Sequence, residues 1–430
     1  MKGLKILSEE AKEFVLEGSR INIVNPQSNA EVFDGKYLIV DGKRKLDLTR
    51  LDYLGLGSNH KVRDIMKNAI EGHDISCPAS QMIMKAAPNI KLEKALANFH
   101  GMSESIVYTT GYAANENVIQ ALGLRMNTPH IAPYVLETKM GKSSRSIPTI
   151  FFIDEDSHFS MQAAARNAKL AVKDKCQVYK FPAGNHDGLQ KSLGNSMSVG
   201  PAVRIIISDT LSSTSGRMFD VKALCEIAEE YDCLLYLDEA HAVGALGPQG
   251  RGIANAFGDI EKYRDRMIIM GTLTKVFCQL GGYVTMSSRY LSWYLRVCSP
   301  HYLFSAPVPP WMAETLVQMI TLISGEFGDI ERAKLADVAG HLRQRLLENG
   351  FNILDSNSHI VPVSINDDVK AAKVKEYLLE KGFVASFFGY PAVKRGESLI
   401  RFSLCADITK DEIDSLMKTM LSVREKFMVN

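Results

Sequence analysis

Three short segments of the sequence carry residues whose chemistry could be combined in one site. Lys275 follows the apolar run MIIMG by a few positions, and a lysine amine at a strand end can form an imine with an aldehyde. Asp238 ends the run LLYLD one βα spacing earlier, where its carboxylate can keep a ring nitrogen protonated. Gly111, in TTGYAAN, opens a predicted helix whose free N–H groups can bind phosphate. Together these parts predict a site for pyridoxal 5'-phosphate.

Each of these features also has a simpler interpretation. A strand-end lysine is usually a solvated surface residue, and LYLDEAH at 235–241, with Asp238, Glu239 and His241, could be the acidic box of a nucleotide hydrolase. Such a hydrolase needs a glycine-rich phosphate loop, but the triplet Gly141-Lys142-Ser143 has Leu136 where the first glycine belongs. The combination therefore favours pyridoxal phosphate over ATP.

The elements that position these residues are short apolar runs alternating with helical patterns. Runs at 151–154, 203–208, 234–239 and 267–272 recur at intervals of roughly 30 residues, which is typical of repeated βα units. Between two of them an apolar stripe recurs at helical spacing, namely Val221, Leu224, Cys225 and Ala228. We expect a mostly parallel sheet covered by helices, with the reactive residues at its carboxyl edge.

The rest of the chain predicts three parts: an arm over 1–59, a large α/β domain over 60–305 and a small α+β domain over 306–430. The arm should hold a short helix at 8–18 and a hairpin at 36–48 that turns at Asp41-Gly42. Residues 124–149 have no clear periodicity and indicate a long excursion. The small domain should contain a helix at 329–348, strands at 359–365, 383–388 and 399–404, and a final helix at 410–426.

Composition limits the possible partners. Fifty basic against 49 acidic residues give a net charge of +1, so we expect no nucleic-acid binding. No stretch approaches the roughly 18 apolar residues of a membrane span. Seven cysteines without a CxxC pair indicate free thiols in a reducing cytoplasm.

Eight segments, in order along nearly the whole chain, resemble the α-oxoamine synthases, a branch of fold-type I pyridoxal-phosphate enzymes. They are DYLGL (52–56), LEKALANFHG (92–101), TGYAAN (110–115), DEDSHFS (154–160), LDEAHAVGALGPQGRG (237–252), GTLTK (271–275), LFSAPVPP (303–310) and LIRFSL (399–404). The resemblance implies an α/β fold with a mostly parallel seven-stranded sheet, helices on both faces and a smaller α+β C-terminal domain. It also implies a homodimer.

The same resemblance implies a role for each matching residue. Lys275 would form the imine with the cofactor, Asp238 would pair with its ring nitrogen, and His158 would stack on the ring. His241 and Ser213 would lie near its phenolic oxygen.

The remaining implied roles concern the phosphate and the substrate. The phosphate would be held by Gly111, Tyr112 and Thr272, with Ser305 reaching it across the dimer interface. Arg401 stands at the family's carboxylate-binding position, and its guanidinium fork suits a planar carboxylate.

The chain departs from the family at several positions. Leu51 replaces an asparagine before DYLGL and Asn89 replaces a histidine, which indicates a changed amino-acid pocket. Val276 follows the lysine where a small residue is usual, so we expect it to crowd the cofactor site. Three other features are similar to the aminoketone autoinducer synthases of the same family: the loop SCPASQMIMKAAPN in place of a glycine-rich stretch, the pattern D-[TS]-x-x-S-T before Gly216, and the C-terminal IRFSL-x-x-D.

The resemblance implies decarboxylative condensation of an amino acid with an acyl thioester, on coenzyme A or acyl carrier protein, to give an α-aminoketone for a signalling or secondary metabolite. The cofactor would be pyridoxal 5'-phosphate, with no metal. An aminotransferase or aldolase acting on a small amino acid is the alternative, because both use the same cofactor machinery.

Overall fold

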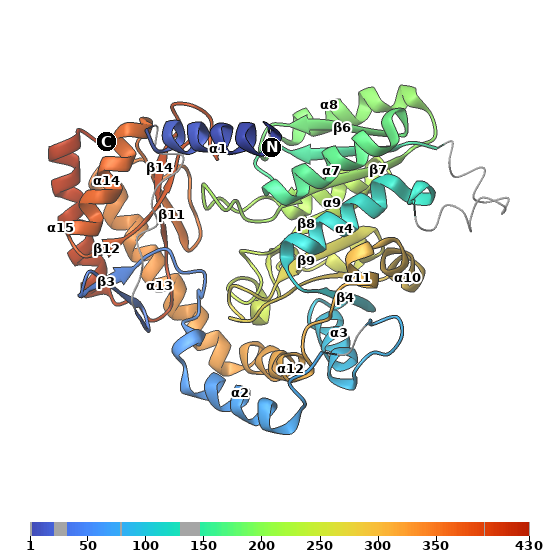
Figure 1. The fold of residues 1–430 in the computed structure, drawn as a ribbon, viewed down its shortest axis with the longest axis horizontal. Coiled ribbons are helices and arrows are strands. Elements are labelled where there is room, and N and C mark those ends of the chain that lie inside the picture. Colours follow the sequence, from blue (N-terminus) through green and yellow to red (C-terminus); the bar gives the residue numbers. More distant parts are fainter. Residues whose placement is uncertain (1, 21–31, 78–79, 130–146, 391, 430) are drawn as a thin grey trace.

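The computed structural model describes residues 2–20, 32–77, 80–129, 147–390 and 392–429 (Figure 1). Its centre is a seven-stranded sheet in which all strands run in one direction except β10, which lies between β4 and β9 and is antiparallel to both. The strands in spatial order are β4 (Glu104–Tyr108), β10 (Gly282–Met286), β9 (Met267–Thr272), β8 (Leu234–Asp238), β7 (Val203–Asp209), β5 (Thr149–Asp154) and β6 (Cys176–Phe181). The fold class and the strands expected from the four apolar runs are confirmed.

Helices cover both faces of this sheet because its central strands are apolar on both sides. On one face α4 (Gly111–Leu124), α7 (Phe159–Val172), α10 (Arg289–Cys298) and α11 (Pro300–Phe304) pack against Phe151, Ile205 and Ile268. On the other face α8 (His186–Ser196) and α9 (Val221–Glu230) pack against Phe152, Ile206 and Leu235. The predicted stripe of α9 is buried there.

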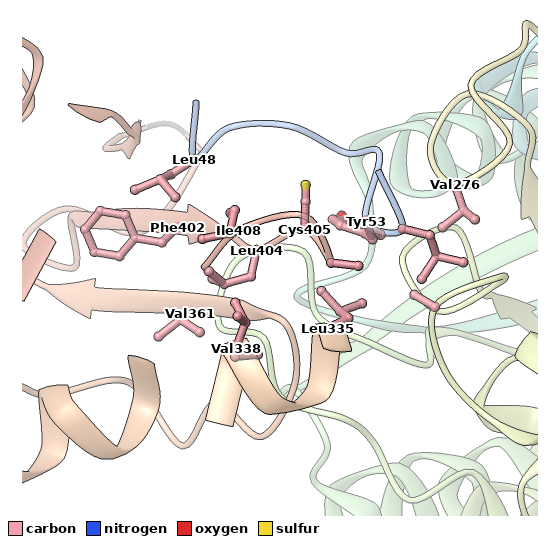
Figure 2. Close-up of a cluster of buried hydrophobic side chains, with 14 of the residues drawn as sticks. Leu48, Tyr53, Val276, Leu335, Val338, Val361, Phe402, Leu404, Cys405 and Ile408 are labelled. Atoms are coloured by element: carbon pink, nitrogen blue, oxygen red, sulfur yellow. The ribbon is translucent and has the colours of Figure 1, made fainter. Parts of the chain in front are cut away.

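The C-terminal part is a three-stranded antiparallel sheet with helices against it. Its strands are β11 (Ile360–Ser364), β14 (Leu399–Ser403) and β13 (Ser386–Phe388), and its helices are α13 (Glu326–Glu348), α14 (Asp368–Glu380) and α15 (Lys410–Phe427). Figure 2 shows part of the buried cluster that joins it to the N-terminal arm, with Leu48 and Tyr53 beside Phe402 and Leu404. The helix expected at 329–348 starts three residues earlier, directly after Gly325.

The N-terminal arm pairs with the C-terminal part through a second sheet. The hairpin of β2 (Tyr37–Val40) and β3 (Lys43–Asp47) turns at Asp41 and Gly42, both left-handed, as expected for a type I′ turn. β1 (Val32–Asp34) lies on one side of it and β12 (Phe383–Val384) on the other. The single strand expected at 383–388 is therefore wrong: its first half pairs with β3 and its second half with β14, so the chain changes sheets at Ala385.

Three further helices lie where the arm meets the large sheet: α2 (His60–Gly72), α3 (Ala87–Phe99) and α12 (Pro310–Ser324), with α12 packed on the other two. The first helix, α1 (Lys2–Arg20), is longer than expected. Of the predicted excursion, 124–129 forms the end of α4 and a short 3-10 turn, whereas 130–146, including Gly141-Lys142-Ser143, lies outside the described residues. The domain boundaries at 59 and 305 stay predictions.

Across the described ranges, no helix is both long and apolar enough to cross a bilayer. All seven cysteines are free, as predicted.

Candidate active site

A cavity of about 230 Å³ lies at the carboxyl ends of β7 and β8, against the first turn of α4. Open α/β sheets bind ligands at this edge because loops and helix N-termini converge there. Its wall includes most of the residues that the sequence predicted for the cofactor: Gly111, Tyr112, His158, Ser213, Asp238, His241, Thr272 and Lys275. Ser305 and Arg401 do not line it.

Asp238 is held by donors on both carboxylate oxygens. Asn115 Nδ2 donates to Oδ2 at 2.8 Å, and the Ala240 backbone N–H donates to Oδ1 at 2.8 Å. Asn115 is fixed in turn, since the Tyr236 hydroxyl donates to its Oδ1 at 2.7 Å. The carboxylate is almost fully buried, so these bonds hold a negative charge at the cavity wall.

His158 belongs to the same network. Its Nδ1 lies 2.7 Å from the Ser160 hydroxyl, and Ser160 also accepts a hydrogen bond from Asn115 at 3.0 Å. The His158 backbone N–H donates to Asp209 Oδ2 at 3.0 Å, where Asp209 ends β7 beside Asp238. Desolvation at the cavity wall lowers the pKa of His158 although its side chain is partly exposed, which favours the neutral ring that can stack on an aromatic ring.

Lys275 lies just beyond the end of β9, where its side chain is half-buried at the cavity wall. Desolvation lowers the pKa of its amine to about 8, although Asp238 and Asp209 favour the charged form. Burial and the neighbouring Asp238 charge raise the pKa of Asp209 well above its usual value. The amine is therefore available as a free base close to neutral pH, which imine formation requires.

The first turn of α4 has the properties of a phosphate cradle. Thr110 caps the helix by accepting a hydrogen bond from the Ala113 N–H at 3.0 Å, while the N–H groups of Gly111 and Tyr112 have no acceptor within the described part of the chain. A Cβ on Gly111 would lie 3.3 Å from Thr272 Oγ1, so glycine keeps this approach open. Free N–H groups, a helix N-terminus and the Thr272 hydroxyl fit a phosphate.

Arg401 lies behind the cavity wall. Its Nη1 donates to the Ser213 backbone oxygen at 2.7 Å, and its guanidinium carbon lies 4.6 Å from the centre of the Phe388 ring. The Nε atom is buried without an acceptor in the described residues. Part of the guanidinium is thus left to bind an anion.

Ser305 is tied to its own chain. Its hydroxyl donates to the His301 backbone oxygen at 2.7 Å, and His301 Nε2 lies 3.0 Å from the Thr109 hydroxyl. Ser305 therefore lies near the start of α4 but outside the cavity of the same chain.

Two expectations about the pocket are wrong. Asn89 lies on α3, where its Nδ2 donates to the Val308 backbone oxygen at 2.7 Å, so it contributes to helix packing and does not line the cavity. Val276 does not crowd the cavity either, because its side chain turns into the core against Gly244. Leu51 lines a separate hollow on the far side of Lys275, beside Arg50.

Sequence reasoning missed five residues that line the site or support its walls by hydrogen bonds. Asn115, Ser160 and Tyr53 lie inside motifs that were recognised, whereas Asp209 and Tyr236 lie on strands recognised only as apolar runs. The signal was present for Asp209: it ends a strand next to the one that ends with Asp238. The partner of Tyr53, His241 at 2.6 Å, is remote in sequence and left no signal.

The sheet, the lysine at the cavity wall, the buried carboxylate and the helix N-terminus define a fold-type I pyridoxal-phosphate site, and comparison with known proteins agrees. The family model "Aminotransferase class I and II" matches residues 147–420. The 8-amino-7-oxononanoate synthase of Fervidobacterium nodosum is 30% identical, over 100% of both chains. The serine palmitoyltransferase of Sphingobacterium spiritivorum is 28% identical, over 90% of this chain and 88% of that protein.

Solved structures share the fold. Serine palmitoyltransferase of Sphingomonas wittichii superposes with a TM-score of 0.83 at 21% identity, covering 99% of each chain. That of S. paucimobilis, solved with bound PLP, gives 0.80 at 22% identity, covering 99% of this chain and 98% of that one. The chain belongs to the aminotransferase class I and II family, in its α-oxoamine synthase branch, and its cofactor is pyridoxal 5'-phosphate.

Proposed function

We propose that this chain condenses an amino acid with an acyl thioester, with loss of carbon dioxide, to give an α-aminoketone. One observation carries the proposal: a desolvated lysine amine, a buried carboxylate and an open helix N-terminus line one cavity with an arginine directly behind it. Both curated relatives described above, an 8-amino-7-oxononanoate synthase and a serine palmitoyltransferase, support it. Bound pyridoxal phosphate supplies an electron sink for negative charge at the substrate Cα.

Lys275 and Asp238 have separate roles in proton transfer and proton retention. With a pKa of about 8, the Lys275 amine can accept a proton from the substrate Cα near neutral pH and return it later. Asp238, fixed by Asn115 and the Ala240 N–H, keeps a proton on the ring nitrogen opposite its carboxylate. His158 caps the cavity as a neutral ring.

We assign the amino-acid carboxylate to Arg401. One nitrogen of the guanidinium is anchored to Ser213, and the buried, unpartnered Nε is a donor that a carboxylate oxygen could accept from in a charge-assisted bond. A cleft of about 620 Å³, lined by Phe159, Phe388 and Tyr390 among others, shares His158 and Ser213 with the cofactor cavity and is our proposed path for the acyl thioester.

We also propose that the active unit is a homodimer. Ile83, Met84 and Phe304 are 81%, 73% and 78% exposed, and they form one apolar patch because Ser80 donates to the Leu303 backbone oxygen at 3.0 Å. Large exposed apolar side chains that gather in this way mark an interface. Ser305 adjoins this patch, as required if it reaches the cavity of a second chain.

The cellular location and the product class are finer proposals. Seven free thiols support a reducing compartment such as the cytoplasm. A signalling or secondary-metabolite product rests on the sequence departures alone.

Product analysis tests the proposed function. The purified, cofactor-loaded enzyme is screened with single amino acids for a change in visible absorbance, and then with acyl thioesters on coenzyme A and on acyl carrier protein. We expect equal amounts of thiol and carbon dioxide to be released, and none from Lys275→Ala. A keto acid formed from the amino acid without thiol release would indicate an aminotransferase and contradict the proposal.

A further inference from the structure

A buried tyrosine outside the cavity contacts a histidine on its wall. The Tyr53 hydroxyl lies 2.6 Å from Nδ1 of His241, and Tyr53 is completely buried. His241 lines the cofactor cavity and Tyr53 does not. Figure 2 shows Tyr53 within the core cluster, next to Cys405. The hydrogen bond therefore links the core directly to the site.

Both partners are uncharged. Burial raises the pKa of Tyr53, so the phenol keeps its proton. Burial also lowers the pKa of His241 well below its usual value, and the groups facing the ring reinforce this effect: Lys275, Arg401, His359 and His158. A neutral imidazole carries a single N–H, on Nδ1 or on Nε2.

The surroundings decide which nitrogen carries it. If Nδ1 carried the hydrogen and donated to Tyr53, the phenolic hydrogen would need another acceptor, and none is within reach among the described residues. The nearest ring, that of His359, packs on Tyr53 with centroids 4.0 Å apart, but no hydrogen bond joins it to the phenol. A buried hydroxyl without an acceptor is costly, so Tyr53 donates to Nδ1.

We infer that Tyr53 is a positioning residue, which donates its phenolic hydrogen to Nδ1 of His241 and thereby holds the N–H on Nε2, facing the cofactor cavity. The Nε2 atom has no protein partner in the described structure, so this N–H is free to donate to a bound group. The identification of this group as the phenolic oxygen of the cofactor rests on the proposed function. The assignment of the His241 tautomer does not depend on it.

The chain supplies a matched control. Tyr283 makes the same type of contact, its hydroxyl lying 2.8 Å from Nε2 of His100, and both residues are buried away from the cavity. Burial lowers the pKa of His100 to about 3, so this histidine is neutral as well. Tyr53→Phe and Tyr283→Phe each remove one buried hydroxyl from a tyrosine–histidine pair, but only the first alters the site.

The direct test is nitrogen NMR of the full-length, cofactor-loaded enzyme labelled with ¹⁵N-histidine, with His241 assigned through a His241→Gln spectrum. In the parent enzyme Nδ1 of His241 should give an unprotonated signal and Nε2 a protonated one. Tyr53→Phe should move both signals toward the average of two exchanging tautomers, whereas Tyr283→Phe should leave them in place. Unchanged His241 signals in Tyr53→Phe, or equal changes in both variants, would overturn the inference.

Two further readouts complete the test. Tyr53→Phe should lower kcat on the order of tenfold, the effect of losing one buried hydrogen bond, with little change in KM for the amino acid. It should also raise the pH midpoint of the cofactor's visible absorbance, because a weaker donor stabilises the phenolate less. If Tyr53→Phe does not fold, 3-fluorotyrosine at position 53 must still shift the Nδ1 signal, and no shift would refute the assignment. Failure of the condensation assay would leave the NMR result valid.

Discussion

At the scale of single residues, the reactive groups of this site are recognisable in the sequence, but the residues that hold them by hydrogen bonds are not. Lys275, Asp238 and Gly111 lie at strand ends or a helix start, and that position can be deduced from periodicity. Tyr53, Asn115 and Tyr236 act through hydrogen bonds to residues more than 100 positions away in the chain. Only folding brings those partners together, so no local sequence pattern predicts them.

The carboxylate of Asp238 can be tested by an isosteric change. In Asp238→Asn the new amide oxygen can still accept from the Ala240 N–H, and the phosphate cradle and Lys275 are untouched, although Asn115, held by Tyr236, loses one acceptor of its Nδ2. We therefore expect the cofactor to be retained, measured by absorbance after dialysis. Turnover should fall by roughly a hundredfold or more, because a neutral amide cannot hold the ring proton. Full turnover with bound cofactor would contradict this role.

The lowered pKa of Lys275 predicts how cofactor uptake depends on pH. A base whose pKa falls from 10.5 to about 8 loses its proton earlier as pH rises, and only the free amine forms the imine. The rate of pyridoxal phosphate uptake by the cofactor-free protein should rise through pH 8 and then level off. An uptake rate that keeps rising toward the ordinary lysine value would contradict the burial argument, and borohydride should trap no cofactor on Lys275→Ala.

At the scale of elements, the sequence predicts the type of each element better than its partner. The runs that form β5 and β9 are six residues long and buried at every position, and such short apolar runs favour a buried strand over a helix. The segment 383–388 looks equally continuous, but its two halves pair with different sheets because Phe383 lies opposite Leu46 and Phe388 opposite Leu399. Strand pairing depends on the whole fold, so a segment of six residues has no sequence pattern that predicts its partner strands.

The approach of β10 to α4 gives an element-scale prediction. A Cβ on Gly282 would lie 2.4 Å from Gly111 Cα, so Gly282→Ala must displace the first turn of α4. Such overpacking costs about 1–3 kcal/mol, and cofactor retention and the thermal midpoint should both fall. Gly194→Ala, on α8 with nothing within 4 Å of the new methyl group, is the control and should keep both. Equal behaviour of the two variants would mean that α4 tolerates the shift.

Glu239 braces the loop after β8 and should make stability depend on pH. Its Oε1 accepts from the Ala254 N–H at 2.7 Å, and burial raises its pKa from 4.5 to about 7. The folded state therefore binds an extra proton between these values, so the free energy of unfolding falls as pH rises through that window, by up to about 1.4 kcal/mol per pH unit.

Glu239→Gln should reduce this slope and stabilise the protein above pH 7, as measured by urea unfolding at several pH values. The control is Glu261→Gln, whose exposed carboxylate pairs with Arg264 and has a lowered pKa. A slope that survives in Glu239→Gln would assign the pH dependence to the other buried acids with raised pKa values, Asp154 and Asp209.

At the scale of the whole molecule, the N-terminal arm and the C-terminal part form a common core although they stand at opposite ends of the chain. β3 pairs in parallel with β12, and Leu48 and Tyr53 pack among residues of β14 and the loop after it. This contact places Tyr53 against His241, so the packing of the two chain ends against each other also supports a residue of the cavity wall. The hairpin itself was predictable from Asp41-Gly42; its partner strand, some 340 residues away, was not.

The exposed patch of Ile83, Met84 and Phe304 predicts how the dimer can be broken. Met84→Glu places a charge in a contact that must lose water, so we expect monomers in sedimentation and weakened cofactor retention. Leu170→Glu, at a side chain that is 70% exposed on α7, is the control and should remain dimeric. A fully active monomer of the parent enzyme would refute the dimer proposal.

A mixing experiment determines which chain's site Ser305 serves. Ser305→Ala should weaken cofactor retention by about 1.5–3 kcal/mol, the strength of one charge-assisted hydrogen bond. In dimers of Ser305→Ala with Lys275→Ala, a serine that reaches across the interface leaves one site with both native residues, so retention and turnover at that site should return to parental values. A serine that serves its own chain leaves no intact site, because the chain that keeps Lys275 also carries the alanine. Persistent weak retention in the mixed dimer would therefore show that Ser305 acts through His301 and Thr109 of its own chain, where the structure places it.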